Sequence, residues 1–145
     1  MPIFELKLPK SIARALNLPV SDPRRQQIKV LKKLMRKKQL GDLLFLQVNC
    51  FWNRNQKYYD DAKWRGTKLI GGGPLYTQFS HFIDLMIWLT GEPFDITSNL
   101  FTLNKTIKTE FEDSGIIDFT LENGGKGILN FTTAAYQTNV ESSIT

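Results

Sequence analysis

The residues of this 145-residue sequence that could do chemistry gather in a segment with the pattern of an apolar helix. At about 100° per residue, Thr77, His81, Asp84 and Trp88 fall within about 60° of one another on such a helix. His81 is also the only histidine of the chain. Burial of an imidazole and a carboxylate costs free energy unless the groups are paired or used. This polar strip is therefore the first candidate for a functional site.

The strip allows two interpretations. A histidine titrates near neutral pH, so His81 suits proton transfer to or from a hydroxyl, as alcohol–ketone interconversion requires. Asp84 follows three residues later, so it can pair with His81 or face the same cleft. The spacing alone favours the other interpretation, a core histidine with satisfied hydrogen bonds. A metal site is not expected, because one His and one Asp make a poor ligand set.

Two features precede the strip. Gly71-Gly72-Gly73 fits a phosphate-cradling loop at a helix start, a plain entry into a tightly packed helix, or a backbone close to a ligand. Neither Gly-x-Gly-x-x-Gly nor Gly-x-x-x-x-Gly-Lys-Ser/Thr occurs in the chain, so a nucleotide-binding domain of the usual kind is missing from it. Arg65 could pair with a phosphate or carboxylate and Trp64 could stack on a flat ring, or the tryptophan could simply tether its loop.

The elements that would position these side chains follow from periodicity. Residues 24–39 predict an amphipathic helix with a basic face, and residues 43–52 predict a strand. Residues 53–73 predict a long loop. Residues 74–90 predict a second helix, started by Gly73 and Pro74 and ended by Gly91. This helix is apolar almost all round, so we expect it to be buried between layers.

The remaining chain is strand-like. One or two strands are expected in 94–108, and alternation over 117–122 predicts a strand with one covered face. Asn123-Gly124-Gly125 predicts a tight hairpin turn, followed by strands in 126–138 and 140–145. The fold class is therefore α+β, with helices on one face of an open, mostly antiparallel sheet. We expect an irregular lead-in over 1–23 and one folded domain over 24–145.

Composition excludes several classes of protein. Residues 1–40 carry a net charge of +9 and residues 41–145 carry −4, so the basic excess is local and nucleic-acid binding is not favoured. No segment is long and apolar enough to span a membrane, and the N-terminus does not resemble a signal peptide. The cytoplasm is the expected location. The single cysteine, Cys50, is expected to be a buried structural thiol.

The motifs taken together resemble the Gfo/Idh/MocA family, named for glucose–fructose oxidoreductase, inositol dehydrogenase and relatives. The resemblance runs from about residue 24 to the end of the chain. Its residues are Tyr58-Tyr59, Trp64-Arg65-Gly66, Gly71-Gly72-Gly73, Leu75, Gln78, His81, Ile83-Asp84, Trp88-Leu89, Gly91, Glu112-Asp113 and the pattern from Phe119 to Gly127.

The resemblance implies a two-domain enzyme. Family members carry an N-terminal Rossmann domain that binds NAD or NADP and a C-terminal domain with an open sheet. This chain resembles the front portion of the second domain, so we expect it to lack the Rossmann domain and to be truncated at its C-terminus. The family's catalytic lysine lies in a Glu-Lys-Pro motif that does not occur here. We therefore expect no cofactor to bind this chain alone, and we expect a homo-oligomer formed through the open sheet.

The resemblance also implies roles for single residues. His81 matches the histidine that contacts the reacting hydroxyl, and Asp84 matches a carboxylate that organises the site. Many members have Asp or Asn where Thr77 stands here, which is a departure from the pattern. The remaining matches are expected on the substrate or cofactor side of the site: Tyr59, Trp64, Arg65, Gly72, Gly73 and Gln78.

Two functions are open at this point. Phe51-Trp52-Asn53-Arg54 followed by Tyr58-Tyr59 is similar to enzymes that oxidise nucleotide-linked N-acetylated hexuronic acids in surface-polysaccharide synthesis. The first function is thus the substrate domain of an NAD(P)-dependent oxidoreductase that acts on a sugar or nucleotide-sugar. The alternative is a non-catalytic sheet module for self-association or sugar binding.

Overall fold

The computed structural model describes residues 5–6 and 24–145. The rest of the expected lead-in over 1–23 lies outside the described residues. The strands are β1 (Glu5–Leu6), β2 (Phe45–Phe51), β3 (Phe94–Phe101), β4 (Ser114–Thr120), β5 (Lys126–Thr132) and β6 (Glu141–Ile144). The helices are α2 (Arg24–Arg36), α3 (Gln56–Asp60), α4 (Lys68–Gly71), α5 (Pro74–Thr77) and α6 (Ser80–Thr90).

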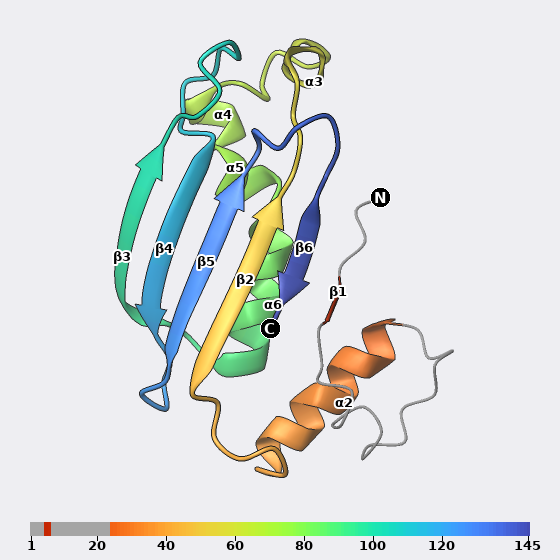
Figure 1. The fold of residues 1–145 in the computed structure, drawn as a ribbon, viewed down its shortest axis with the longest axis vertical. Coiled ribbons are helices and arrows are strands. Elements are labelled where there is room, and N and C mark those ends of the chain that lie inside the picture. Colours follow the sequence, from red (N-terminus) through yellow and green to blue (C-terminus); the bar gives the residue numbers. More distant parts are fainter. Residues whose placement is uncertain (1–4, 7–23) are drawn as a thin grey trace.

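One mixed sheet organises the fold, with strand order β1-β6-β2-β5-β4-β3. β3, β4 and β5 form an antiparallel meander, and β2 pairs antiparallel with β6. The pairs β2–β5 and β1–β6 are parallel. Figure 1 shows α4, α5 and α6 behind the sheet, and none of the described helices covers the face turned toward the viewer. The predicted α+β class, with an open and mostly antiparallel sheet, is confirmed.

The core lies between the sheet and α6. Alternate residues of β5, Leu129 and Phe131, point to the helix side, as strand geometry requires. Phe79 and Phe82 meet them from the helix side, with 0% and 1% of their surfaces exposed. Burial of such a side chain contributes about 1.5–3 kcal/mol. Cys50 lies in the same cluster, and burial raises the pKa of its thiol to about 12, as expected for a structural cysteine.

The helix predicted over residues 74–90 is interrupted. Gly73 and Pro74 start α5 and Gly91 ends α6 as expected, but regular helix stops at Thr77 and resumes only at Ser80. The interruption puts Phe79 at the centre of the core, 5.0 Å from the Trp52 ring and 5.8 Å from the Phe131 ring. The expected burial on all sides is also wrong. The outer face of α6 includes exposed residues, Ile87 and Trp88 among them.

The loop predicted over residues 53–73 contains two short helices. α3 begins after Asn55, whose Oδ1 accepts a hydrogen bond from Tyr58 N at 3.0 Å. Such a side chain replaces one of the backbone acceptors that the first turn of a helix lacks. α4 follows before the triple glycine. The segment is therefore more ordered than its composition predicted.

α2 is amphipathic as predicted, with Leu31 and Leu34 buried and Lys33 exposed. Lys32 Nζ donates to Leu89 O in the last turn of α6 at 3.0 Å, which places a positive charge at the negative end of that helix dipole. α2 is thereby joined to the C-terminal end of α6.

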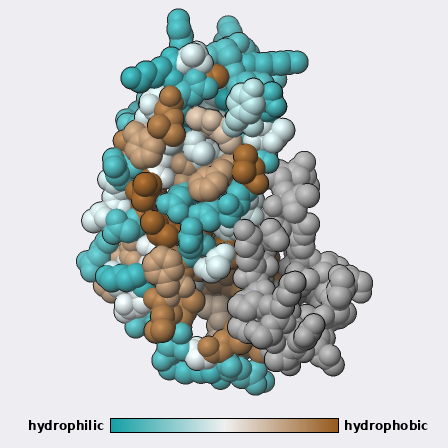
Figure 2. Space-filling view, in the orientation of Figure 1, coloured by the Kyte–Doolittle hydropathy of each residue, from teal (hydrophilic) through white to brown (hydrophobic). Residues whose placement is uncertain are grey.

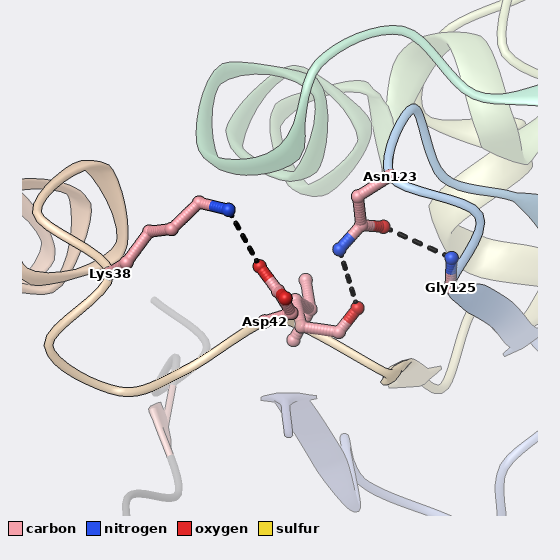
Figure 3. Close-up of polar contacts among 5 residues, drawn as sticks. Lys38, Asp42, Asn123 and Gly125 are labelled. Carbon is pink, nitrogen blue, oxygen red and sulfur yellow. Dashed lines mark hydrogen bonds and ion pairs between the residues drawn. The ribbon is translucent and has the colours of Figure 1, made fainter.

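The loop after α2 is held by polar contacts that Figure 3 shows. Lys38 Nζ lies 3.2 Å from Asp42 Oδ1, and Asn123 Nδ2 donates to Leu43 O at 2.8 Å. Asn123 Oδ1 accepts from Gly125 N within the predicted hairpin turn. One asparagine therefore shapes the β4–β5 turn and joins it to the start of β2.

Two glycines of this hairpin are constrained for different reasons, one by crowding of its neighbours and the other by its backbone conformation. A Cβ at Gly127 would lie 2.1 Å from the Phe119 ring, whereas Gly124 has φ +84° and no neighbour within 4 Å. We expect Gly127→Ala to lower the free energy of unfolding by about 1–3 kcal/mol through overpacking. Gly124→Ala should cost about 1 kcal/mol through its left-handed backbone alone. Urea denaturation of both variants measures this, and a smaller loss for Gly127→Ala than for Gly124→Ala would contradict the crowding argument.

Candidate functional site

His81 lies in the first turn of α6 with one side of its ring open to solvent. The ring centroid is 4.2 Å from that of Phe82 and 5.8 Å from that of Trp52. Among the described residues, none forms a hydrogen bond with His81. Desolvation on the packed side lowers the pKa of His81 below its ordinary value of 6.5. The imidazole is therefore neutral at pH 7 and able to accept a proton.

The predicted polar strip is only partly assembled. His81, Asp84 and Trp88 share the outer face of α6 and are exposed, with Trp88 at 45%. His81 and Asp84 form no hydrogen bond with each other. Thr77 belongs to α5, and its hydroxyl donates to Gly73 O at 2.9 Å. The premise that the strip is buried is wrong, because Asp84 and Trp88 are exposed and the His81 ring packs on one side only, against Trp52 and Phe82.

The triple glycine makes the turn between α4 and α5. Gly72 and Gly73 have φ values of +67° and +85°, which L side chains rarely adopt. A Cβ at Gly71 would lie 2.6 Å from Trp64 O. This close approach and the two left-handed residues give the glycines a backbone role. Ligand contact by Gly72 and Gly73 stays a prediction.

Tyr59 and Gln78 are each only 5% exposed. The Tyr59 ring lies 5.2 Å from the Tyr58 ring and 6.3 Å from the Phe111 ring. Burial raises the pKa of the Tyr59 hydroxyl, an effect that nearby Thr133 and Gln78 partly offset. Both side chains lie beneath the surface of the site. Their predicted contact with a ligand is untested, and it would require some movement.

Five side chains form a stack whose first member, Trp52, lies beside His81, and we call this stack the arginine–aromatic ladder. The Arg54 guanidinium carbon lies 4.7 Å from the Trp52 ring centroid and 4.9 Å from that of Tyr58. The Arg65 guanidinium carbon lies 4.4 Å from the same Tyr58 centroid and 5.8 Å from that of Trp64. The ladder thus consists of Trp52, Arg54, Tyr58, Arg65 and Trp64.

Sequence reasoning quoted all five residues of the ladder but expected a place in the site only for Trp64 and Arg65. Trp52, Arg54 and Tyr58 entered only through the motif that is similar to enzymes acting on nucleotide-linked sugar acids. The structure brings all five into one stack, and the expected ligand contacts of Trp64 and Arg65 stay predictions. The available signal was the recurrence of arginine and aromatic residues between positions 52 and 65. Arginine stacks on aromatic faces more readily than lysine does, so this composition can form such a stack.

The described part of the chain shows neither a metal centre nor a membrane span. No group of three or more His, Cys, Asp or Glu side chains in it is placed to hold a metal ion. None of its helices combines the length and the apolar character that crossing a membrane requires.

Comparison with known proteins decides the family. The model of the GFO/IDH/MocA C-terminal domain matches residues 28–145. The chain belongs to the Gfo/Idh/MocA family. A search of curated proteins found no match. The family assignment from sequence motifs is therefore confirmed, and the match falls on the C-terminal domain of the family.

Solved structures of this family resemble the chain closely. The WlbA dehydrogenase of Bordetella pertussis, in complex with NADH and UDP-GlcNAcA, is 35% identical with a TM-score of 0.75, over 81% of this chain and 36% of that chain. WlbA of Chromobacterium violaceum, in complex with the same two molecules, is 37% identical with a TM-score of 0.72, over 80% and 33%. The Gfo/Idh/MocA chain described here thus spans about a third of the length of these relatives.

A more distant structure shares the fold. A levoglucosan dehydrogenase in complex with NADH and levoglucosan is 21% identical with a TM-score of 0.66, over 79% of this chain and 32% of that chain. At this identity the likeness shows the fold alone.

The protonation of His81 can be measured directly, because the chain has no other histidine. We expect the ring protons of His81 to titrate by NMR below 6.5 in the folded chain, owing to desolvation. The unfolded chain in urea is the control, with a titration near the ordinary value. Since the unfolded state binds the proton more readily, stability should fall as pH drops through 6.5 toward the folded-state pKa. A folded-state pKa above that of the unfolded chain would contradict the desolvation argument.

Proposed function

We propose that this chain is the substrate-binding and catalytic C-terminal domain of an NAD(P)-dependent oxidoreductase that oxidises a hydroxyl of a sugar or nucleotide-sugar. The observation that carries the proposal is the likeness to two WlbA dehydrogenases at 35% and 37% identity, both solved with NADH and UDP-GlcNAcA. A nucleotide-linked sugar acid is therefore the favoured substrate, and surface-polysaccharide biosynthesis in the cytoplasm is the favoured setting.

The chemistry assigned to this chain is proton transfer. His81 is neutral at pH 7 and open on one side, so it can accept the proton of a substrate hydroxyl. A hydride leaves the carbon that carries this hydroxyl in the same reaction. Asp84 lies one helical turn further along the exposed face of α6, where its charge can help to orient the substrate or stabilise the imidazolium. Thr77 keeps its hydroxyl on Gly73 O, so we give it a positioning role.

The remaining predicted residues would surround the substrate. Trp64 is exposed and can border the cofactor or the sugar, with Arg65 held beside it. Gly72 and Gly73 would let a ligand approach the backbone closely. Tyr59 and Gln78 would support this surface from below, since both are buried.

The described residues do not fit a dinucleotide site of their own. They contain no glycine-rich turn between a parallel strand and a helix, and the whole sequence has no Gly-x-Gly-x-x-Gly motif. NAD or NADP, which accepts the hydride when bound, is therefore assigned to another domain of the complete enzyme. We expect no binding of either cofactor to this chain alone.

Replacement of His81 tests the proposed chemistry. In the complete enzyme, His81→Gln should lower turnover of UDP-GlcNAcA by roughly 10²–10⁴-fold, the usual scale for loss of acid–base catalysis. The acid limb of the pH–rate profile should disappear as well, because neutral His81 is the active form. Ser80→Ala, an exposed neighbour on the same helix, is the control. Reduction of NAD(P)+ followed by absorbance measures both, and unchanged turnover of His81→Gln would refute the role.

The open face of the sheet supports a second proposal, self-association. Figure 2 shows apolar side chains on this face among hydrophilic ones. Phe45, Phe94 and Ile116 are 56%, 47% and 44% exposed, and register places all three on the helix-free side. Asn49 accepts hydrogen bonds from Gln47 and Asn130 on the same face. A mixed surface of this kind is typical of protein interfaces.

A charge on this open face tests the self-association. Ile116→Lys should shift the chain from oligomer to monomer in sedimentation experiments, because a buried unpaired charge is costly. Leu69→Lys, at a 95% exposed position on α4, should leave the oligomeric state unchanged. A monomeric wild type would contradict the proposal. An oligomer without any dehydrogenase activity in the complete protein would favour the alternative function, a non-catalytic sheet module.

A further inference from the structure

The ladder fixes two guanidinium groups against one aromatic ring. The Arg54 and Arg65 guanidinium carbons lie 4.9 Å and 4.4 Å from the Tyr58 ring centroid. Stacking uses the flat face of a guanidinium and leaves its edge, which carries the N–H donors, available for hydrogen bonds. The arrangement therefore presents donors in a fixed geometry rather than on mobile side chains.

Both arginines have donors that the described residues do not use. Arg54 Nη1 donates to Asn53 O at 2.6 Å and to Asn139 Oδ1 at 3.2 Å, and Arg65 Nη1 donates to Tyr58 O at 2.9 Å. Nη2 of each arginine donates to no described residue. The Nε atoms are buried without an acceptor.

Neither charge is neutralised within the described chain. No carboxylate of the described residues lies within ion-pair distance of Arg54 or Arg65, whose guanidinium groups share the Tyr58 ring. Two cations that pack against one aromatic ring repel each other, most strongly where burial lowers the local dielectric. The two arginines are therefore suited to bind an anion, which offsets the repulsion and accepts hydrogen bonds from their unused N–H donors.

The ladder begins at the proposed base. Trp52 lies 5.8 Å from the His81 ring and carries Arg54 on its own ring at 4.7 Å. Hydrogen bonds hold this segment in place: Arg54 N donates to Thr133 O at 2.8 Å, Asn53 Nδ2 donates to Ala135 O at 2.6 Å, and Asn53 N donates to Asn139 Oδ1 at 3.0 Å. An anion at Arg54 is thus within one substrate length of the hydroxyl that His81 would deprotonate.

We propose that the arginine–aromatic ladder is an oxyanion subsite, in which Arg54 and Arg65 bind a negatively charged group of the substrate and Arg54 determines specificity. The group is a carboxylate on the sugar or the phosphate attached to it, since both present negatively charged oxygen acceptors to the arginine N–H donors. This inference rests on the proposed function for the identity of the substrate, but not on the occurrence of oxidation.

Binding to the 145-residue chain tests the subsite. The probes are UDP-GlcNAcA and UDP-GlcNAc, which share the diphosphate and differ in the sugar carboxylate. Wild type, Arg54→Gln and Arg54→Lys are titrated by calorimetry, and the arginine Nε–H signals are followed by NMR. Arg54→Gln should weaken binding by about 10- to 100-fold, the scale of a lost charged hydrogen bond. Arg54→Lys should not restore the affinity, because an ammonium neither stacks on an aromatic ring nor donates two parallel hydrogen bonds as a guanidinium does.

The controls separate the subsite from general charge and from folding. Arg36→Gln changes the net charge equally at an exposed position of α2 and should bind like wild type. Tyr58→Phe keeps the ring and should bind more tightly than Tyr58→Leu, which removes the stack. Circular dichroism checks that each variant is folded, and the wild-type Nε–H shifts report on the subsite without any substitution.

Each outcome decides the inference. Loss of affinity for UDP-GlcNAcA alone assigns the subsite to the carboxylate, and equal loss for both probes assigns it to the phosphate. Equal affinity of folded Arg54→Gln and wild type for both probes overturns the subsite. So does the absence of any wild-type Nε–H shift at millimolar probe. Arg54-dependent binding in a complete enzyme that oxidises neither probe would refute the proposed function and leave the subsite standing.

Discussion

The packing of Trp52 at the end of β2 is the contact on which the rest of the site depends. Its indole N–H donates to Ser142 Oγ at 2.7 Å, which joins β2 to β6, and its ring meets Phe79 and Phe82 edge-on at 5.0 Å and 6.0 Å. Only 4% of Trp52 is exposed. Because protein interiors are close-packed, this ring fixes the start of α6 and the surroundings of His81 together.

Sequence periodicity predicted the helices and strands that are determined by local geometry alone. The alternation in β5 and the stripe of α2 follow from local geometry, and both are observed. The interruption before α6 was not predictable, because it arises from the position of Phe79 between Trp52 and Phe131, which are far away in sequence. The exposure of Ile87 is likewise a tertiary outcome, since an apolar run does not say which of its faces the sheet covers.

In the site, too, the features that follow from single residues were predicted and those that depend on tertiary contacts were not. His81 stood out because its chemistry is singular in this chain, and the glycines stood out because backbone with positive φ requires them. The sequence motifs contained every residue of the ladder but did not predict the stack, because its order in space interleaves residues from a strand end, a short helix and the following turn. Arginine and aromatic residues are common in surface loops, and only the distances between them distinguish a stack from a solvated loop.

Trp52 also reconciles two opposed electrostatic demands of the proposed function. A base needs a neutral imidazole, and desolvation against Trp52 and Phe82 lowers the pKa of His81 accordingly. An anionic substrate placed alone beside this imidazole would raise that pKa again by stabilising the imidazolium. If Arg54 and Arg65 hold the anion, their positive charges oppose its field at His81. The ladder would then contribute to catalysis by keeping the base deprotonated as well as to affinity, and the shared indole is the element that sets both distances.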